Sequence, residues 1–312
     1  MAKRMCWRRT GLLPRMRRLG LKRKRMSIWR DGERVNLKHY KKAPLPFIGQ
    51  KRNFIKHFIP LLQQHIHDDG AGWTIVDVFG GSGLLAHTAK RTLPAARVIY
   101  NDFDGYARRL WHINDTEKLR QQCAAIIGNR RDERKLSEQE KQQLIALIET
   151  FDFVDMQTLA SWFLFSGNQA GSWQELKQKI WWNNLPKSPY TDASDYLDGL
   201  EIRHQCFTDL LPEFAGQPET LLLLDPPYLS TMQGAYAKEN YFSLIDFLKM
   251  TEQIKPPFML FGSTRSEVLD YAAWTVQEKR TGWQHWDGYQ VQSLETGVNH
   301  SAKYQDNMVW RF

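Results

Sequence analysis

The residues Asp225, Pro226, Pro227 and Tyr228 directly follow a run of four leucines at residues 221–224. Such an apolar run predicts a strand buried on both faces, so the carboxylate and the aromatic ring come at its end. The prolines have no backbone N–H, so this stretch offers mainly carbonyl and carboxylate oxygens as hydrogen-bond acceptors. Two acceptors beside an aromatic face suit an amino group on a flat ring. A structural proline turn after the strand is the alternative.

A second candidate site is the sequence FGGSG at residues 79–83, called here the glycine loop. It follows the apolar residues Ile75, Val76 and Val78, and precedes a predicted helix that begins near Leu84. Glycines permit a tight turn, and the helix offers free N–H groups and the positive end of its dipole. The loop has neither the GxGxxG spacing of dinucleotide folds nor the Lys-Ser/Thr ending of a P-loop. NAD and ATP are therefore disfavoured, and a simple turn is the alternative.

Asp102 follows a second predicted strand, Val98 to Tyr100, nineteen residues after Gly83. An acid at this position is placed to accept hydrogen bonds from ribose hydroxyls, which predicts an adenosine-containing ligand. A solvated loop carboxylate is the alternative. Because ligands bind beyond the carboxyl ends of parallel strands, we expect the glycine loop, Asp102 and Asp225 to face one crevice.

Two successive strand-loop-helix units predict a parallel α/β sheet. An amphipathic helix with Phe54, Ile55, Phe58 and Ile59 precedes them, and strands are expected again after residue 200. The segment between is helical in places and then polar and loop-like. The predicted organisation is a flexible basic extension at 1–40, a catalytic domain from 41–106 and 201–312, and an insertion at 107–200.

Composition indicates an ordinary globular protein, with 42% hydrophobic and 25% charged residues among 312. No apolar run approaches the roughly 20 residues of a membrane span, so no membrane contact is expected. Cys6, Cys123 and Cys206 fit no disulfide or zinc spacing, which predicts a reducing cytoplasm as the setting, and the histidines show no metal-ligand spacing. The sequence does not fix the oligomeric state, and a monomer is consistent with it.

The net charge of +9 is concentrated at the N-terminus. Residues 1–26 hold eleven Lys or Arg and no acid, which leaves −2 for the rest. This segment is interpreted as an arm that neutralises phosphates, as a targeting presequence, or as an incidental stretch before a start at Met26.

The combination of FGGSG and DPPY resembles amino-methyltransferases that use S-adenosylmethionine, and the order of parts is similar to the Dam-type (alpha-group, DPPY) DNA adenine-N6 methyltransferases. In PFIGQKRNF, Phe47, Gly49 and Lys51 match the aromatic-x-x-Gly-Lys-like pattern that precedes the glycine loop in that family. The segment EIRHQCFTDLL is similar to the family's short adenine-contact strand, with Cys206 in place of the usual acid before Phe207.

The resemblance implies a Rossmann-like S-adenosylmethionine-dependent methyltransferase fold with an inserted, mainly helical target-recognition domain. It implies transfer of a methyl group to the N6 amine of a flipped-out adenine in double-stranded DNA, without a metal. Asp225 and the Pro226 carbonyl would accept the amine hydrogens while Tyr228 stacks on the base. The implied cofactor pocket comprises Phe47, Gly49, Lys51, Asp77, Phe79, Gly81, Gly83, Asp102, Phe207 and Asp225.

Two alternatives stay open: an RNA adenine-N6 methyltransferase, and a non-catalytic, methyltransferase-like DNA-binding subunit. The separation of 142 positions from Gly83 to Asp225 leaves room for a DNA-reading domain and favours DNA. The segment FLFSGNQAGSW lacks the arginine-bearing hairpin of enzymes that read GATC, so that target is not expected. Trp181 and Trp182 are interpreted either as a stacking surface for nucleic acid or as core residues. Roles in restriction-modification, self-protection of a mobile element, or regulation are not distinguished.

Overall fold

The computed structural model describes residues 27–30, 33–36, 38–128, 134–165, 168–228, 242–263, 267–297 and 303–312. The chain divides into two compact units, Met1–Leu37 and Lys38–Phe312. In the first unit, β1 (Ser27–Arg30) pairs antiparallel with β2 (Glu33–Asn36), a hairpin that the sequence did not lead us to expect. The basic segment 1–26 lies outside the described residues. The predicted boundary at residue 40 stays a prediction.

The second unit is built on a seven-stranded sheet in the order β5-β4-β3-β6-β7-β9-β8. Its strands are β3 (Thr74–Asp77), β4 (Arg97–Asn101), β5 (Leu200–Arg203), β6 (Thr220–Leu224), β7 (Phe258–Ser263), β8 (Gln290–Gly297) and β9 (Lys303–Arg311). Strands β5, β4, β3, β6 and β7 are parallel, and β9 is antiparallel to β7 and β8. The order reverses between β3 and β6, as in a doubly wound Rossmann-type sheet, which confirms the predicted fold class.

The leucine run explains why the middle of the sheet is buried on both sides. In β6, Leu221 and Leu223 belong to one apolar cluster, while Leu222 and Leu224 belong to another. Successive side chains of a strand point to opposite faces, so four leucines in a row fill both layers. The strand predicted before Asp225 is therefore confirmed as a central parallel strand.

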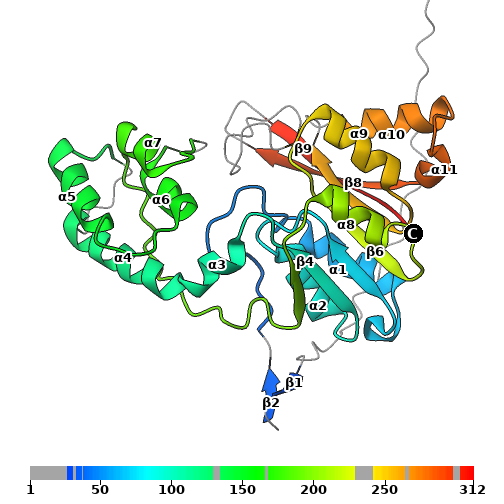
Figure 1. The fold of residues 1–312 in the computed structure, drawn as a ribbon, viewed down its shortest axis with the longest axis horizontal. Coiled ribbons are helices and arrows are strands. Elements are labelled where there is room, and N and C mark those ends of the chain that lie inside the picture. The colour runs from blue at the N-terminus through cyan, green and yellow to red at the C-terminus, as the bar shows by residue number, and fades with distance from the viewer. Residues whose placement is uncertain are drawn as a thin grey trace, which may run out of the picture. The chain divides into compact units, whose positions relative to one another are not determined.

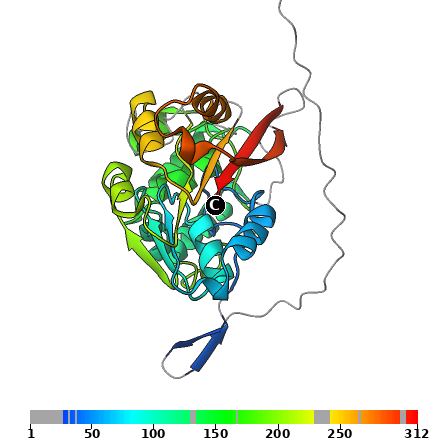
Figure 2. The same ribbon diagram turned by 90° about the vertical axis from the view of Figure 1, so that its right-hand side faces the viewer.

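Helices cover both faces of the sheet, as Figures 1 and 2 show. One face carries α1 (Ile55–His65) and α2 (Leu84–Thr92); the other carries α8 (Phe207–Phe214), α9 (Leu244–Gln253), α10 (Val268–Gln277) and α11 (Trp283–Trp286). The predicted amphipathic helix is α1, preceded by buried Phe54 and burying Phe58 and Leu62 against the sheet. A short 3-10 turn, η1 (Asp68–Gly70), connects α1 to β3.

A separate group of helices lies between β4 and β5 in the sequence (Figure 1). It comprises α3 (Tyr106–Trp111), α4 (Ile113–Ile127), α5 (Glu138–Ile148), α6 (Met156–Phe163) and α7 (Trp173–Gln178). Its own apolar cluster runs in sequence from Leu119 to Trp181. Trp181 is 1% exposed and stacks on Phe163 with 4.6 Å between ring centroids, so it is a core residue and not a stacking surface. The bounds of the insertion, 107–200, stay a prediction.

Candidate active site

Three predicted site segments meet at one edge of the sheet. In β3, Asp77 is the last residue, and it lies opposite Tyr100 of β4 and Leu223 of β6. The glycine loop follows β3, Asp102 follows β4, and Asp225 follows β6. Because these strands are parallel, their carboxyl ends share the edge at which the strand order reverses. This is the position that ligands occupy in open α/β sheets.

The glycine loop is shaped by aromatic neighbours as well as by its turn. Gly81 and Gly83 have positive φ values of 49° and 70°, which favour glycine. A Cβ at Gly80 would lie 2.4 Å from the ring of Tyr100, and one at Gly81 would lie 2.9 Å from the ring of Phe47. Side chains at these positions would therefore collide with rings of the protein itself. The sequence predicted the turn but not this packing.

Two buried tyrosines hold the carbonyl groups of the glycine loop. The hydroxyl of Tyr100 donates to the Gly81 carbonyl over 2.7 Å, and that of Tyr196 donates to the Ser82 carbonyl over 3.0 Å. Both side chains are fully buried. Sequence reasoning treated Tyr100 only as a strand residue and overlooked Tyr196, which lies in a polar segment with no pattern that signals burial.

Asp77 is a buried carboxylate, and one of its two oxygens accepts no hydrogen bond from the described residues. Its Oδ2 accepts a hydrogen bond from the N–H of Ala86 over 3.1 Å, whereas its Oδ1 is buried and has no partner among the described residues. Burial raises the pKa of Asp77 to about 7, and the charge of Asp225 adds to the effect, while the Ala86 N–H and Lys51 oppose it. An unsatisfied buried acceptor is costly unless a ligand group supplies a donor. Asp77 is thus placed to accept from a bound molecule.

We predict that Asp77→Asn stabilises the protein more at pH 8 than at pH 5. Folded Asp77 holds its proton to about pH 7 whereas unfolded Asp releases it near pH 4, so the wild type loses stability as pH rises between these values. Asparagine imitates the protonated form and escapes the loss. The extra gain at pH 8 is about 2–3 kcal/mol, because about two pKa units separate pH 5 from the folded pKa and each corresponds to about 1.4 kcal/mol. Thermal unfolding of both proteins at pH 5 and pH 8 measures this difference in stability. Equal gains at the two pH values would contradict a raised pKa for Asp77.

Asp102 lies beside the glycine loop, but its oxygens already have partners. Its Oδ1 accepts from the N–H of Tyr106 over 2.6 Å and its Oδ2 from that of Ala107 over 2.9 Å, so it caps the beginning of α3. The hydroxyl of Tyr100 lies 2.9 Å from Oδ1, and the residue is 0% exposed. The predicted contact with ribose hydroxyls stays a prediction and would require these bonds to be shared or exchanged.

The structure brings Lys51 and Asp225 together as an ion pair. Lys51 Nζ lies 2.6 Å from Asp225 Oδ2, and the two side chains are only 8% and 19% exposed. The same ammonium donates to the carbonyl of Gly49 over 2.8 Å, and the chain turns there with a positive φ of 82°. Burial raises the pKa of Asp225, and the Lys51 charge opposes that rise. Two residues far apart in sequence thus form one charged, nearly dry centre.

Tyr228 completes this centre on the other side. The Lys51 ammonium lies 5.4 Å from the centroid of the Tyr228 ring, a distance at which a cation is attracted to an aromatic face. Burial raises the pKa of Tyr228, so its hydroxyl stays neutral at physiological pH. Pro226 and Pro227 are buried between the two residues, which fixes the backbone that joins them. Residues 229–241 lie outside the described part of the chain.

Aromatic rings form an apolar wall beside the glycine loop. Phe79 lies 5.3 Å from Phe207 and 5.6 Å from Phe242 between ring centroids. The segment EIRHQCFTDLL begins in strand β5, which ends at Arg203, and continues into α8, of which Phe207 is the first residue. The side chain of Phe207 lies against Phe79, a residue of the predicted pocket, and its contact with a bound adenine stays a prediction. Phe47 packs edge-on against Tyr106 at 5.9 Å.

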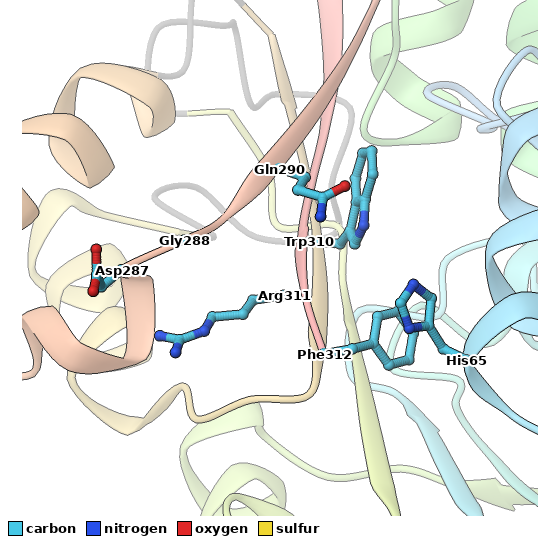
Figure 3. A pocket seen from close by; sticks show the side chains of 7 residues that line it. All are labelled: His65, Asp287, Gly288, Gln290, Trp310, Arg311 and Phe312. Atoms are coloured by element: carbon cyan, nitrogen blue, oxygen red, sulfur yellow. The ribbon is translucent and has the colours of Figure 1, made fainter. Parts of the chain in front are cut away.

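A separate hollow of about 210 Å³ lies at the opposite edge of the sheet, where Arg311 pairs with Phe258 at the start of β7. Figure 3 shows His65 stacked on Phe312, with a centroid separation of 4.0 Å, beside Trp310 and Arg311. The hollow is lined by His65, Asp287, Gly288, Gln290, Trp310, Arg311 and Phe312, none of which belongs to the predicted site.

Within the described ranges, no group of three or more His, Cys, Asp or Glu side chains is arranged to hold a metal ion. Over those same residues, no helix has the length and apolar character needed to cross a membrane.

Comparison with known proteins decides the family. The family model described as D12 class N6 adenine-specific DNA methyltransferase matches residues 47–253, more than half of the chain. The chain belongs to this D12 family. The match confirms the predicted Dam-type resemblance, and it spans every residue of the predicted site. The protein is therefore a methyltransferase by family.

Two further proteins resemble this D12 family member. A Haemophilus influenzae protein, whose description names a methyltransferase and no substrate, is 46% identical over 282 residues, covering 89% of this chain and 95% of that protein. The crystal structure of precorrin-6y C5,15-methyltransferase from Geobacter metallireducens aligns with a TM-score of 0.35 and 8% identity, covering 88% of this chain and 97% of that one. Similarity as low as that of the second protein carries no argument about function.

Proposed function

We propose that this chain is a DNA adenine-N6 methyltransferase that methylates an adenine turned out of the double helix. The observation that carries the proposal is the buried Lys51–Asp225 pair beside Tyr228, at the carboxyl end of β6, in a member of the D12 family. Family membership supports the adenine amine as acceptor, and the site supplies the groups that such an acceptor needs.

The chemistry follows from the weak nucleophilicity of the adenine amine, whose lone pair is conjugated with the ring. The Asp225 carboxylate and the Pro226 carbonyl would each accept one N–H, which localises the lone pair on nitrogen. Lys51 holds Oδ2 of Asp225 and leaves Oδ1 for the base. Tyr228 would stack on the extruded ring. Positioning and preorganised electrostatics would then provide most of the acceleration.

S-adenosylmethionine, which the family implies as methyl donor, fits the edge between β3 and β4. The unpartnered Oδ1 of Asp77 is an acceptor for an ammonium or hydroxyl donor, and Phe79 and Phe207 offer an apolar wall for a purine. The remaining predicted pocket residues are Phe47, Gly49, Lys51, Gly81, Gly83, Asp102 and Asp225. When bound, the cofactor would supply an electrophilic methyl group on a sulfonium.

Basic side chains around Lys51 support a nucleic-acid substrate. Between residues 38 and 67 the chain has no Asp or Glu, and five of its basic side chains are exposed: Lys38, Lys41, Lys42, Arg52 and Lys56. Such a strip on the segment that leads into the site suits the phosphate backbone of DNA. The helical insertion, 107–200, would then choose the target sequence.

We predict that Lys41→Glu combined with Lys42→Glu weakens DNA binding at least about tenfold at low salt. The slope of log affinity against log salt should fall by about one to two, since each phosphate contact contributes about 0.9. Fluorescence anisotropy with a labelled duplex over a salt series measures both quantities. Lys249→Glu with Lys279→Glu is the matched control, since both lysines are exposed and lie at α9 and just after α10. Equal losses in the two double variants would show a net-charge effect without a local contact.

The proposal is tested by transfer of radiolabelled methyl from S-adenosylmethionine to unmethylated double-stranded DNA, with RNA in parallel. Label recovered from DNA as N6-methyladenine is the expected result. Label found in RNA alone would show that the substrate is RNA and not DNA. Cofactor binding without transfer to either would favour a non-catalytic DNA-binding subunit.

A further inference from the structure

The guanidinium of Arg109 is a buried link between the helical insertion and the loop that carries Lys51. Arg109 is 7% exposed. Its Nε donates to Asp155 Oδ2 over 2.9 Å, its Nη1 to Gln157 Oε1 over 2.5 Å, and its Nη2 to the carbonyl of Pro46 over 2.6 Å. Pro46 lies 63 residues before Arg109, and Asp155 lies 46 residues after it. One planar, rigid group therefore joins two distant segments.

On the insertion side, Asp155 is held firmly. Its Oδ1 accepts from the N–H of Thr158 over 3.2 Å, and its Oδ2 accepts from the Thr158 hydroxyl over 2.6 Å, so it caps α6. The same helix buries Trp162 and Phe163 in the core of the insertion. A displacement of α6 is therefore passed to the Asp155 carboxylate and from there to Arg109.

On the site side, Arg109 fixes the residue immediately before Phe47. The ring of Phe47 packs against Gly81 of the glycine loop, and Lys51 follows four residues later. The N–H of Leu45 donates to the hydroxyl of Tyr106 over 2.9 Å, so α3 holds this loop at two adjacent points. Figure 1 shows α3 lying between the other insertion helices and β4.

We propose that Arg109 is a positioning residue that couples the helical insertion to the cofactor site. The inference rests on the proposed function, because it concerns S-adenosylmethionine affinity. The Arg109 guanidinium is planar and rigid, so its bond to the Pro46 carbonyl cannot stay unchanged when Asp155 or Gln157 moves. Events in the insertion, such as contact with DNA, therefore change the position of Phe47 and Lys51. By linkage, cofactor binding alters DNA affinity by the same factor.

The test is cofactor affinity, measured by calorimetry with S-adenosylmethionine alone and no DNA. Asp155→Asn keeps the helix cap, since asparagine is also a good N-cap residue, but removes the charge that Arg109 meets. We expect it to weaken cofactor binding about three- to tenfold, the range of couplings transmitted between sites. Arg109→Lys, which keeps the charge but not the planar fork, should weaken binding in the same direction.

Glu117→Gln is the matched control. It makes the same carboxylate-to-amide change at another buried arginine pair of the insertion, where Glu117 Oε1 lies 2.7 Å from Arg120 Nη2. Arg120 donates to Glu117 and to the Pro186 carbonyl, and Glu117 also accepts from Gln121 and from the N–H of Tyr190. All of these hydrogen bonds lie within residues 107–200. Its melting temperature should fall to an extent similar to that of Asp155→Asn, with cofactor affinity unchanged.

The outcomes separate the inference from the proposed function. A wild-type protein that binds no S-adenosylmethionine would overturn both. Wild-type binding together with equal affinity in Asp155→Asn would overturn the coupling alone, as would an equal loss in Asp155→Asn and Glu117→Gln. Loss confined to Asp155→Asn and Arg109→Lys supports Arg109 as the link.

Discussion

Replacing Asp225 with asparagine is expected to lower the rate of methyl transfer about 10³-fold. Asparagine keeps the size of the side chain but turns one acceptor oxygen into an NH2 donor and removes the negative charge. The adenine amine would then face a donor where it needs an acceptor. The loss should lie in kcat, because the contact gains strength as positive charge develops on the attacking nitrogen.

The same substitution removes the carboxylate charge that Lys51 meets at 2.6 Å. The side chain of Lys51 is only 8% exposed, and breaking a buried ion pair on one side costs up to about 3–5 kcal/mol of folding stability. Activity must therefore be measured under conditions where the variant is folded, with single-turnover transfer at saturating cofactor and substrate. Asp209→Asn, an exposed position in α8, is the control and should retain activity. Transfer by Asp225→Asn within tenfold of wild type would remove Asp225 from the proposed chemistry.

The general architecture of this site could be predicted because it depends on local patterns. A buried strand followed by glycines, a second followed by Asp102, and a third followed by Asp225 place these segments at one sheet edge whenever the strands are parallel. The apolar run at 221–224 indicated such a strand without knowledge of its neighbours. The family resemblance placed Lys51 and Asp225 in one pocket but did not predict the ion pair between them, since nothing in either segment alone fixes their distance.

Other parts of the site could not be predicted, because they depend on contacts between distant segments. Tyr196 lies in a polar stretch, yet its hydroxyl reaches the Ser82 carbonyl from 114 residues away. Arg109 reads as a surface charge on a helix, and only the fold shows its guanidinium to be buried. Asp102 was predicted to accept from ribose hydroxyls, and no local pattern indicated that the N–H groups of Tyr106 and Ala107 donate to its two oxygens. The local sequence pattern does not indicate which polar atoms will form hydrogen bonds with distant segments.

Removing the charge of Lys51 is expected to change the pH dependence of the reaction. Burial already raises the pKa of Asp225, the charge of Asp306 adds to it, and Lys51 is the group that opposes both. In Lys51→Met the carboxyl should therefore hold its proton further toward neutral pH. A protonated Asp225 has no negative charge and is a weaker acceptor for the amine N–H, so transfer near pH 7 should fall and then recover as pH rises.

Transfer by Lys51→Met should therefore be slower at pH 7 than at pH 9, because the ionised fraction of a carboxyl rises about tenfold for each pH unit below its pKa. Stability should change in the opposite direction. An acid whose pKa is raised in the folded protein makes folding less favourable as pH climbs from its unfolded pKa, near 4, to its folded value. The variant should thus gain activity and lose stability over part of the same pH range.

This pair of opposite slopes separates an electrostatic role of Lys51 from a purely structural one. A lysine needed only for packing would give a variant whose activity and stability fall together at every pH. The measurement is the pH–rate profile of transfer at saturating S-adenosylmethionine, together with thermal unfolding in the same buffers. Lys56→Met, at an exposed position in α1, provides the control for loss of one positive charge near the site. A Lys51→Met profile parallel to that of the control would show that Asp225 keeps its charge without Lys51.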